Sequence, residues 1–228
     1  MLKFAPPSTS QQQPSETASG LVLAASESSS TLNKWTFTSS SSQGIRVTPL
    51  VLLPEASPVK ALAWTYFNSN SNFDSPCFAF GASTGRVAFA KYEHDAPQKE
   101  STSTSSHSLG NGSITVINEY NDKPARPCSL LAFSPSSSLL LIGLGKYRDL
   151  PTCYVWDPVA AATLASLAPN EALLSAAWLS GSTNSFLAGI TSRWVRIYDL
   201  RRTSTATAAT EANNAAQVVI ATRFVLNT

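Results

Sequence analysis

A pattern of short apolar strands that recurs three times constrains the fold of this chain more than any other feature. The first strand of each unit ends in an aromatic residue, at Trp64, Phe133 and Trp178, and the second strand contains a glycine. The third strand ends in an aromatic residue, which is followed by Asp157 and Asp199 in the last two units. Phe133 and Trp178 lie 45 residues apart, and the two aspartates lie 42 residues apart. The sequence therefore predicts a series of similar small sheets.

Incomplete copies of the unit flank the complete ones. Residues 19–37 read as the second and third strands of a unit, with Trp35 in the aromatic position, and residues 45–53 read as its outer strand. A repeat of about 40–45 residues is typical of the blades of β-propellers. We therefore predict an all-β fold, a partial β-propeller of about three blades plus fragments. A β-sandwich also uses short alternating strands, but the glycine and aromatic positions recur in register, which favours the propeller.

Composition predicts how the chain is divided. Residues 1–18, rich in Ser, Gln and Pro, are predicted to be a disordered tail, and residues 19–200 are predicted to form the blades. The polar stretch 93–112 is expected to be an insertion within the blades, and residues 201–216 a low-complexity linker. Residues 217–228 are predicted to start a further blade. Because the chain ends inside that strand-like stretch, we expect a truncated part of a longer protein, with a natural short form as the alternative.

The strand that begins at Trp194 carries bulky side chains on both faces. Val195 and Ile197 alternate along it with Trp194 and Tyr198. A strand in a one-sided sheet has one apolar and one polar face, whereas a propeller strand lies between two neighbouring blades. We therefore predict that Val195 and Ile197 face one neighbour, and that Trp194 and Tyr198 face the other.

Three units plus fragments do not close a ring of the roughly 4–8 blades that propellers contain. If five large apolar side chains on each exposed blade face lack a partner, roughly 7–15 kcal/mol of burial is lost per face, at about 1.5–3 kcal/mol each. A whole domain is stable by only about 5–15 kcal/mol. We therefore expect an isolated open propeller to be marginally stable, to associate, or to be completed by another open propeller.

Bulk composition disfavours several classes of function. The net charge of +2 is too small for the basic surface of a nucleic-acid-binding protein. Cys77, Cys128 and Cys153 are odd in number and scattered, so they predict neither a disulfide framework nor a zinc site, and they fit a reducing compartment. His94 and His107 both lie in the polar insertion, where no rigid frame would hold a catalytic base. We expect no enzyme activity, no cofactor and no metal.

Two segments, "VWD" at 155–157 and "VRIYDLR" at 195–201, resemble the third strands of WD repeats. A longer series between about residues 19 and 200 resembles, in order, the N-terminal propeller of the Mios family. This second resemblance is carried by Gly81 and Gly85 with Arg86-Val87, by Gly143-Leu144-Gly145-Lys146-Tyr147-Arg148 before Trp156-Asp157, and by Leu187-Ala188-Gly189 before Tyr198-Asp199-Leu200-Arg201. The sequence departs from the family at 145–148, where members usually have Asp-Lys-His-Arg.

The resemblance implies a role without catalysis. Mios-family proteins are subunits of the SEA complex, a GATOR-type assembly at the vacuolar or lysosomal surface. It therefore implies a WD-repeat scaffold for protein–protein interaction that positively regulates TOR complex signalling in response to amino acids. The implied partners are other WD-repeat subunits, and the implied location is cytoplasmic, peripheral at that membrane and reached only through partners. Family members also carry an α-solenoid and a zinc-binding module, for which these 228 residues contain no counterpart.

Arg201 and Arg202 suggest an alternative in a different class. Phosphoinositide-binding propellers carry a Phe-Arg-Arg-Gly motif, whose paired guanidinium groups bind phosphate through charge-assisted hydrogen bonds. Here Leu200 and Thr203 replace the Phe and the Gly. The simpler interpretation is that Arg201 and Arg202 are solvent-exposed residues at the end of a strand. Lipid binding is therefore kept only as the alternative to the scaffold. The residues that would bind a protein partner are not indicated by the sequence.

Overall fold

The computed structural model contains sixteen β-strands and no α-helix in the part of the chain that it describes. Residues 94–111 of the insertion predicted over 93–112, with His94 and His107, lie outside the described residues, as do residues 202–216 of the predicted linker. The described residues are 1–5, 17–26, 29–38, 45–55, 57–65, 76–93, 112–135, 138–167, 172–191, 194–201 and 217–223.

The strands form four antiparallel sheets of four strands each, and in every sheet the strands follow one another in chain order. We call the sheets blades 1 to 4. Blade 1 contains β1 (Leu2–Phe4), β2 (Thr17–Ala25), β3 (Ser30–Thr38) and β4 (Ile45–Leu52). Blade 2 contains β5 (Val59–Trp64), β6 (Cys77–Ala82), β7 (Val87–Glu93) and β8 (Ser113–Tyr120). Blade 3 contains β9 (Cys128–Phe133), β10 (Leu140–Leu144), β11 (Cys153–Asp157) and β12 (Ala162–Leu167). Blade 4 contains β13 (Leu173–Trp178), β14 (Ser185–Ile190), β15 (Trp194–Asp199) and β16 (Gln217–Arg223).

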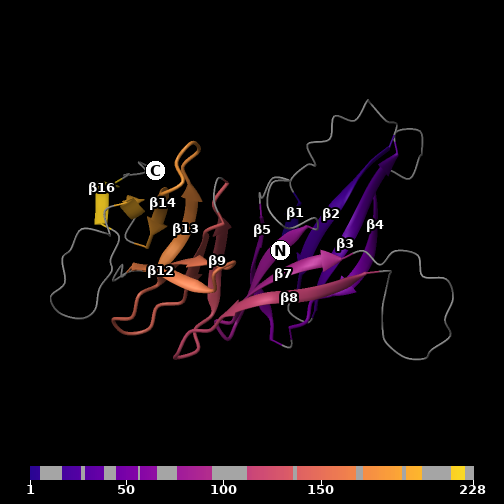
Figure 1. Cartoon of the computed structure of the whole chain (residues 1–228), viewed down its shortest axis with the longest axis horizontal. Helices are drawn as coiled ribbons and strands as arrows, with labels where there is room; N and C mark the ends of the chain where they lie inside the picture. Colours follow the sequence, from indigo (N-terminus) through magenta and orange to yellow (C-terminus); the bar gives the residue numbers. More distant parts are fainter. Residues whose placement is uncertain are drawn as a thin grey trace, which may run out of the picture.

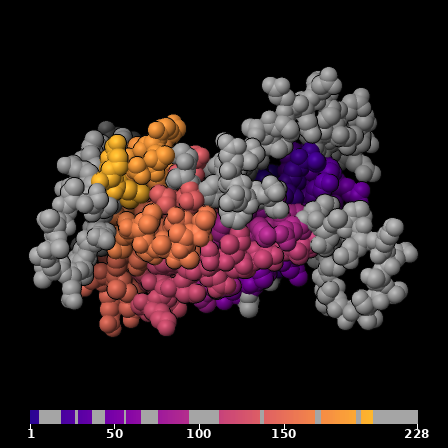
Figure 2. Space-filling view, viewed as in Figure 1, coloured from indigo at the N-terminus to yellow at the C-terminus, as the bar shows by residue number. Residues whose placement is uncertain are grey.

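Apolar side chains join each blade to the next. One core cluster lies between blades 1 and 2, a second between blades 2 and 3, and a third between blades 3 and 4. Among the described residues no such cluster joins blade 1 to blade 4. The colours of Figure 1 and Figure 2 show these two blades at opposite ends of the long axis of the molecule. The prediction of an all-β, incomplete propeller is therefore confirmed, and the blades form an open arc.

Strand β6 shows why the middle of a blade has no polar face. All six of its residues are buried. Phe78 and Phe80 pack in the core shared with blade 1, whereas Cys77 and Ala79 pack in the core shared with blade 3. A second apolar face thus replaces the solvated face that an ordinary antiparallel sheet presents to water.

Gly81 and Gly85 set the distance between blade 2 and the chain that enters blade 3. A Cβ atom at Gly81 would lie 2.7 Å from the Cβ atom of Cys128, so a larger residue would displace β9. Gly85 has a φ of +86°, and a Cβ atom there would lie 2.5 Å from the carbonyl oxygen of Arg126. Both glycines are therefore required by the packing of successive blades.

The structure differs from two of the predicted boundaries. Residues 2–4, within the predicted tail over residues 1–18, form β1 and pair with β2, which begins at Thr17. Residues 217–223, within the predicted start of a further blade, form β16 and pair with β15 as the fourth strand of blade 4. Four four-stranded blades therefore stand where three blades plus fragments were expected.

Candidate partner-binding surfaces

The inner strands of the four blades end in equivalent aromatic residues: Phe4, Trp64, Phe133 and Trp178. Trp64 and Phe133 are only 6 % and 5 % exposed, and each packs in the core shared with the preceding blade. Trp178 packs in the same way against the core shared with blade 3. Phe4 is 63 % exposed, because no described blade lies in front of it. The same position is thus covered at three blades and open at the first.

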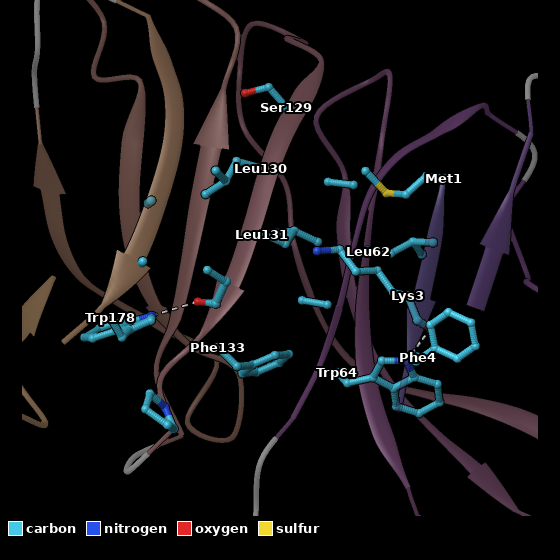
Figure 3. Close-up of a pocket in the computed structure, with 16 residues that line it drawn as sticks. Met1, Lys3, Phe4, Leu62, Trp64, Ser129, Leu130, Leu131, Phe133 and Trp178 are labelled. Carbon is cyan, nitrogen blue, oxygen red and sulfur yellow. Dashed lines mark hydrogen bonds between the residues drawn. The ribbon is translucent and has the colours of Figure 1, made fainter. Parts of the chain in front are cut away.

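Two of these aromatic residues also donate a hydrogen bond to the preceding blade. The indole Nε1 of Trp64 donates to the backbone carbonyl oxygen of Lys3 at 2.9 Å, and that of Trp178 donates to the carbonyl oxygen of Ala132 at 2.9 Å (Figure 3). Both acceptors directly precede the aromatic residue of their own inner strand. A repeated donor and acceptor pair therefore fixes two of the three junctions between blades.

Sequence analysis missed Phe4 because β1 is only three residues long. The signal is nevertheless present, because Leu2-Lys3-Phe4 resembles the ends of the other inner strands, Leu62-Ala63-Trp64 and Leu131-Ala132-Phe133. Aligning the four aromatic positions rather than searching for a full unit would have found it.

Blade 1 has an apolar face that no described blade covers. Leu2, Phe4, Ile45, Val47 and Leu52 are large apolar side chains that are exposed. The strand register places all five on the side of blade 1 that points away from blade 2. We call these five residues the open face of blade 1.

The side chain of Trp35 lies on the same side of blade 1 as the open face and covers part of the sheet between its strands. A Cβ atom at Gly20 would lie 2.7 Å from its Nε1 atom, so the indole lies directly over that glycine. Its ring meets Phe4 edge-on, with 6.5 Å between ring centroids. Val22 and Asn33 on the same side of the sheet are buried. The large apolar side chains that stay exposed on this side, among the described residues, are therefore the five of the open face.

Strand β15 packs on a neighbouring blade on one of its two predicted sides, and no described blade covers the other side. Tyr198 is buried in the core shared with blade 3 and stacks on Phe186, with 5.1 Å between ring centroids. Val195 and Ile197 are half-buried and lie on the opposite side of the strand. The side chain of Trp194 lies outside the described residues.

Val195 and Ile197 belong to a second uncovered face. The register pairs Ile197 with Leu187 and Leu187 with Ala177, so these side chains all point away from blade 3. Ala177 is exposed, and the other three are half-buried. We call Ala177, Leu187, Val195 and Ile197 the open face of blade 4. The arc of blades therefore presents an apolar face at both of its ends.

The inner strands β1, β5, β9 and β13 line a groove of about 440 Å³ (Figure 3). Most of the lining side chains are apolar, and Lys3 and Ser129 contribute polar groups. The described residues that line it include no carboxylate, histidine or cysteine. The groove takes the place of the central channel of a propeller.

Two arginines form ion pairs near the junctions between blades. Arg86, in the turn before β7, pairs with Glu55 of the connection from blade 1 at 2.5 Å and with Glu119 of β8 at 2.5 Å. The side-chain hydrogen bonding that Arg86 donates to the Glu119 carboxylate is the largest cause of a raised pKa at Arg86, and it also lowers the pKa of Glu119. Arg126 is buried and ion-paired with Asp122. These charges are satisfied within the chain, so we assign them to the fold rather than to a ligand.

Arg201, the first residue of the lipid-binding alternative, is bound by a neighbouring side chain. Its Nη2 atom donates to Oδ2 of Asp199 at 2.6 Å, and its backbone N–H donates to Oδ1 at 3.0 Å. The side-chain hydrogen bond to Asp199 raises the pKa of Arg201. Arg202 lies outside the described residues. A phosphate group would have to compete with Asp199 for Arg201, and lipid binding stays a prediction.

The three cysteines lie in the cores between blades. Burial raises the pKa of Cys77 to about 11 and the pKa values of Cys128 and Cys153 to about 12. They are therefore neutral thiols at physiological pH, without the thiolate that a nucleophile or a zinc ligand needs. Across the described part of the chain, no three His, Cys, Asp or Glu side chains gather as a metal site would require.

Comparison of this chain with protein-family models and with curated proteins found no match. Within the described ranges, no helix has the length and apolar character needed to cross a bilayer.

Proposed function

We propose that this chain is a non-enzymatic module for protein–protein interaction, an open propeller whose uncovered blade faces bind protein. One observation carries the proposal. The aromatic position that is buried against a neighbouring blade at Trp64 and Phe133 is exposed at Phe4. Exposed large apolar side chains that gather on one side of a sheet are typical of an interaction site.

The open face of blade 1 offers enough apolar area for a specific contact. Its five side chains are about half to two-thirds exposed. Full burial of a large apolar side chain contributes about 1.5–3 kcal/mol, so covering the five would contribute roughly 4–9 kcal/mol. Part of that is offset by the loss of translational and rotational freedom on association. A partner that also covers the open face of blade 4 would bury apolar side chains on both faces and would bind more tightly.

The resemblance to the Mios family supplies the cellular part of the proposal. In this role the chain is a WD-repeat subunit of a SEA/GATOR-type complex and promotes TOR complex signalling in response to amino acids. It acts by presenting loops and blade edges to other WD-repeat subunits, without making or breaking bonds. It reaches the vacuolar or lysosomal membrane through these subunits.

Affinity purification from a mild lysate tests this proposal. A tagged chain is expected to recover other WD-repeat subunits of a SEA/GATOR-type complex. Phe4→Glu is expected to reduce their recovery at least about tenfold, because a charge would have to be buried without a partner. Leu164→Glu is the matched control, since Leu164 is 48 % exposed on β12, away from both open faces. Absence of such subunits from the unmodified sample would contradict the proposal.

A further inference from the structure

We propose that a second copy of this chain covers both open faces, so that two arcs of four blades close into one ring of eight. In this ring the open face of blade 4 packs on the open face of blade 1 of the second copy, and the reverse contact is identical. The inference deepens the proposed function and rests on it, because it names a second copy of this chain as the protein that the open faces bind. Other subunits then bind the closed pair, and Phe4→Glu lowers their recovery by opening it.

The three junctions inside the chain show what the missing junction requires. At each of them a row of side chains on the later blade packs on the earlier blade. In blade 4 the row is Trp178, Phe186 and Tyr198, which the register places side by side against blade 3. The equivalent row of blade 2 begins with Trp64 and Phe78. The equivalent row of blade 3 consists of Phe133, Leu140 and Trp156.

Blade 1 carries the same row without a described blade in front of it. The register pairs Phe4 with Val22 and Val22 with Asn33, as it pairs Trp178 with Phe186 and Phe186 with Tyr198 in blade 4. Val22 and Asn33 are buried at these positions, whereas Phe4 is 63 % exposed, so Phe4 is the member of this row that a preceding blade would cover.

Blade 4 carries the receiving side of the junction. Ala177 occupies the position of Lys3 and Ala132, the residues that accept the indole of the next blade, because each directly precedes the aromatic end of its inner strand. The chain thus contains each half of one more junction, at opposite ends of the arc. A second copy supplies both missing halves at once.

The charges on the two uncovered faces and the total number of blades both agree with a ring closed by two copies. Among the described residues on the two uncovered sides, Asp199 is the charged residue that the register places there, and Arg201 neutralises it. Four blades from each copy give about eight in the ring, the upper end of the range for propellers. Blades 1 and 4 of one chain lie at opposite ends of the long axis, so they do not cover each other (Figure 1). An interface between two different faces closes a ring when the rotation per copy permits it.

The mass of the purified chain in solution is the first test. Light scattering after gel filtration is expected to give twice the chain mass of 24.2 kDa at every concentration above the dissociation constant. Phe4→Glu is expected to raise that dissociation constant at least about tenfold, because it buries an unpaired charge, and Leu164→Glu is expected to leave it unchanged. A monomer would overturn the proposal, and so would a mass that grows without limit as the concentration rises.

Chemical cross-linking tests which faces meet. Ala24 pairs with Leu2 on the uncovered side of blade 1, and Ala177 lies on the open face of blade 4. An equimolar mixture of Ala24→Cys and Ala177→Cys chains, treated with a short bismaleimide, is expected to give a product of doubled mass. A mixture of Ala24→Cys and Leu164→Cys chains is expected to give none. The natural cysteines are buried and do not compete. Equal yields from both mixtures, or no product from the first, would overturn the proposal.

The two proposals fail in different ways. A monomeric purified chain that still recovers SEA/GATOR-type subunits overturns the ring and leaves the proposed function intact. A stable dimer that recovers no such subunits supports the ring and contradicts the cellular role.

Discussion

Gly85 and Gly181 share a positive φ, at +86° and +79°, but differ in their surroundings. A Cβ atom at Gly85 would lie 2.5 Å from the carbonyl oxygen of Arg126, whereas nothing lies within 4 Å of one at Gly181. Gly85→Ala is therefore expected to lower the free energy of unfolding by about 2–5 kcal/mol, from left-handed strain plus displaced backbone. Gly181→Ala should cost only the strain, about 1–2 kcal/mol. Urea unfolding followed by tryptophan fluorescence measures both, and equal losses would show that Arg126 moves aside freely.

The buried thiol of Cys153 should make the free energy of unfolding depend on pH in the alkaline range. Burial raises the pKa of its thiol from 9.0 to about 12. A pKa that is higher in the folded state stabilises the fold below the pKa of the unfolded state, and this contribution is lost as the pH rises. The free energy of unfolding should therefore fall from about pH 9 towards pH 12, by up to about 1.4 kcal/mol per pH unit for this thiol. Cys153→Ala should have a correspondingly shallower slope in equilibrium unfolding, and parallel slopes would contradict the assignment.

At the scale of single elements, some strands could be located from the sequence and others could not. Strands such as β6 and β15 could be located because glycine, aromatic residues and aspartate recur along them. β1 could not, because three residues are too few to show an alternating pattern and its partner β2 lies beyond residues 5–16. β16 was recognised as strand-like, but its pairing with β15 depends on tertiary contact across residues 202–216.

Removing residues 1–5 is expected to destabilise blade 2 as well as blade 1. The deletion removes the carbonyl oxygen of Lys3, which accepts the hydrogen bond from Trp64 at 2.9 Å, and the inner strand that pairs with β2. The hydrogen bond alone contributes about 1 kcal/mol, or about 2–4 °C in Tm for a chain of this size, so the decrease should be at least that large. Lys3→Ala is the control, because the backbone carbonyl remains. A deletion that leaves the Tm unchanged in differential scanning fluorimetry would contradict the role given to β1.

At the scale of the whole molecule, the face-to-face stacking of the blades could be predicted from strands that are apolar on both sides. Tyr198 packs on blade 3 while Val195 and Ile197 lie on the other side, as the alternation along β15 indicated. The open faces could be expected in principle, since too few blades were visible to close a ring. Their residues could not be named from the sequence. Phe4 and Val47 come from strands far apart in the chain, and only the register brings them to one side of blade 1.

An eight-bladed ring of two copies also predicts that stability depends on chain concentration. Partner binding stabilises the folded state by mass action. A tenfold increase in concentration is worth about 1.4 kcal/mol per dimer, or about 0.7 kcal/mol per chain, which corresponds to a Tm increase of about 1.5–3 °C. Phe4→Glu should shift this dependence to concentrations at least about tenfold higher, and Leu164→Glu should leave it unchanged. A Tm that stays constant for the unmodified chain over about a hundredfold range of concentration would mean that the four blades fold with both end faces uncovered.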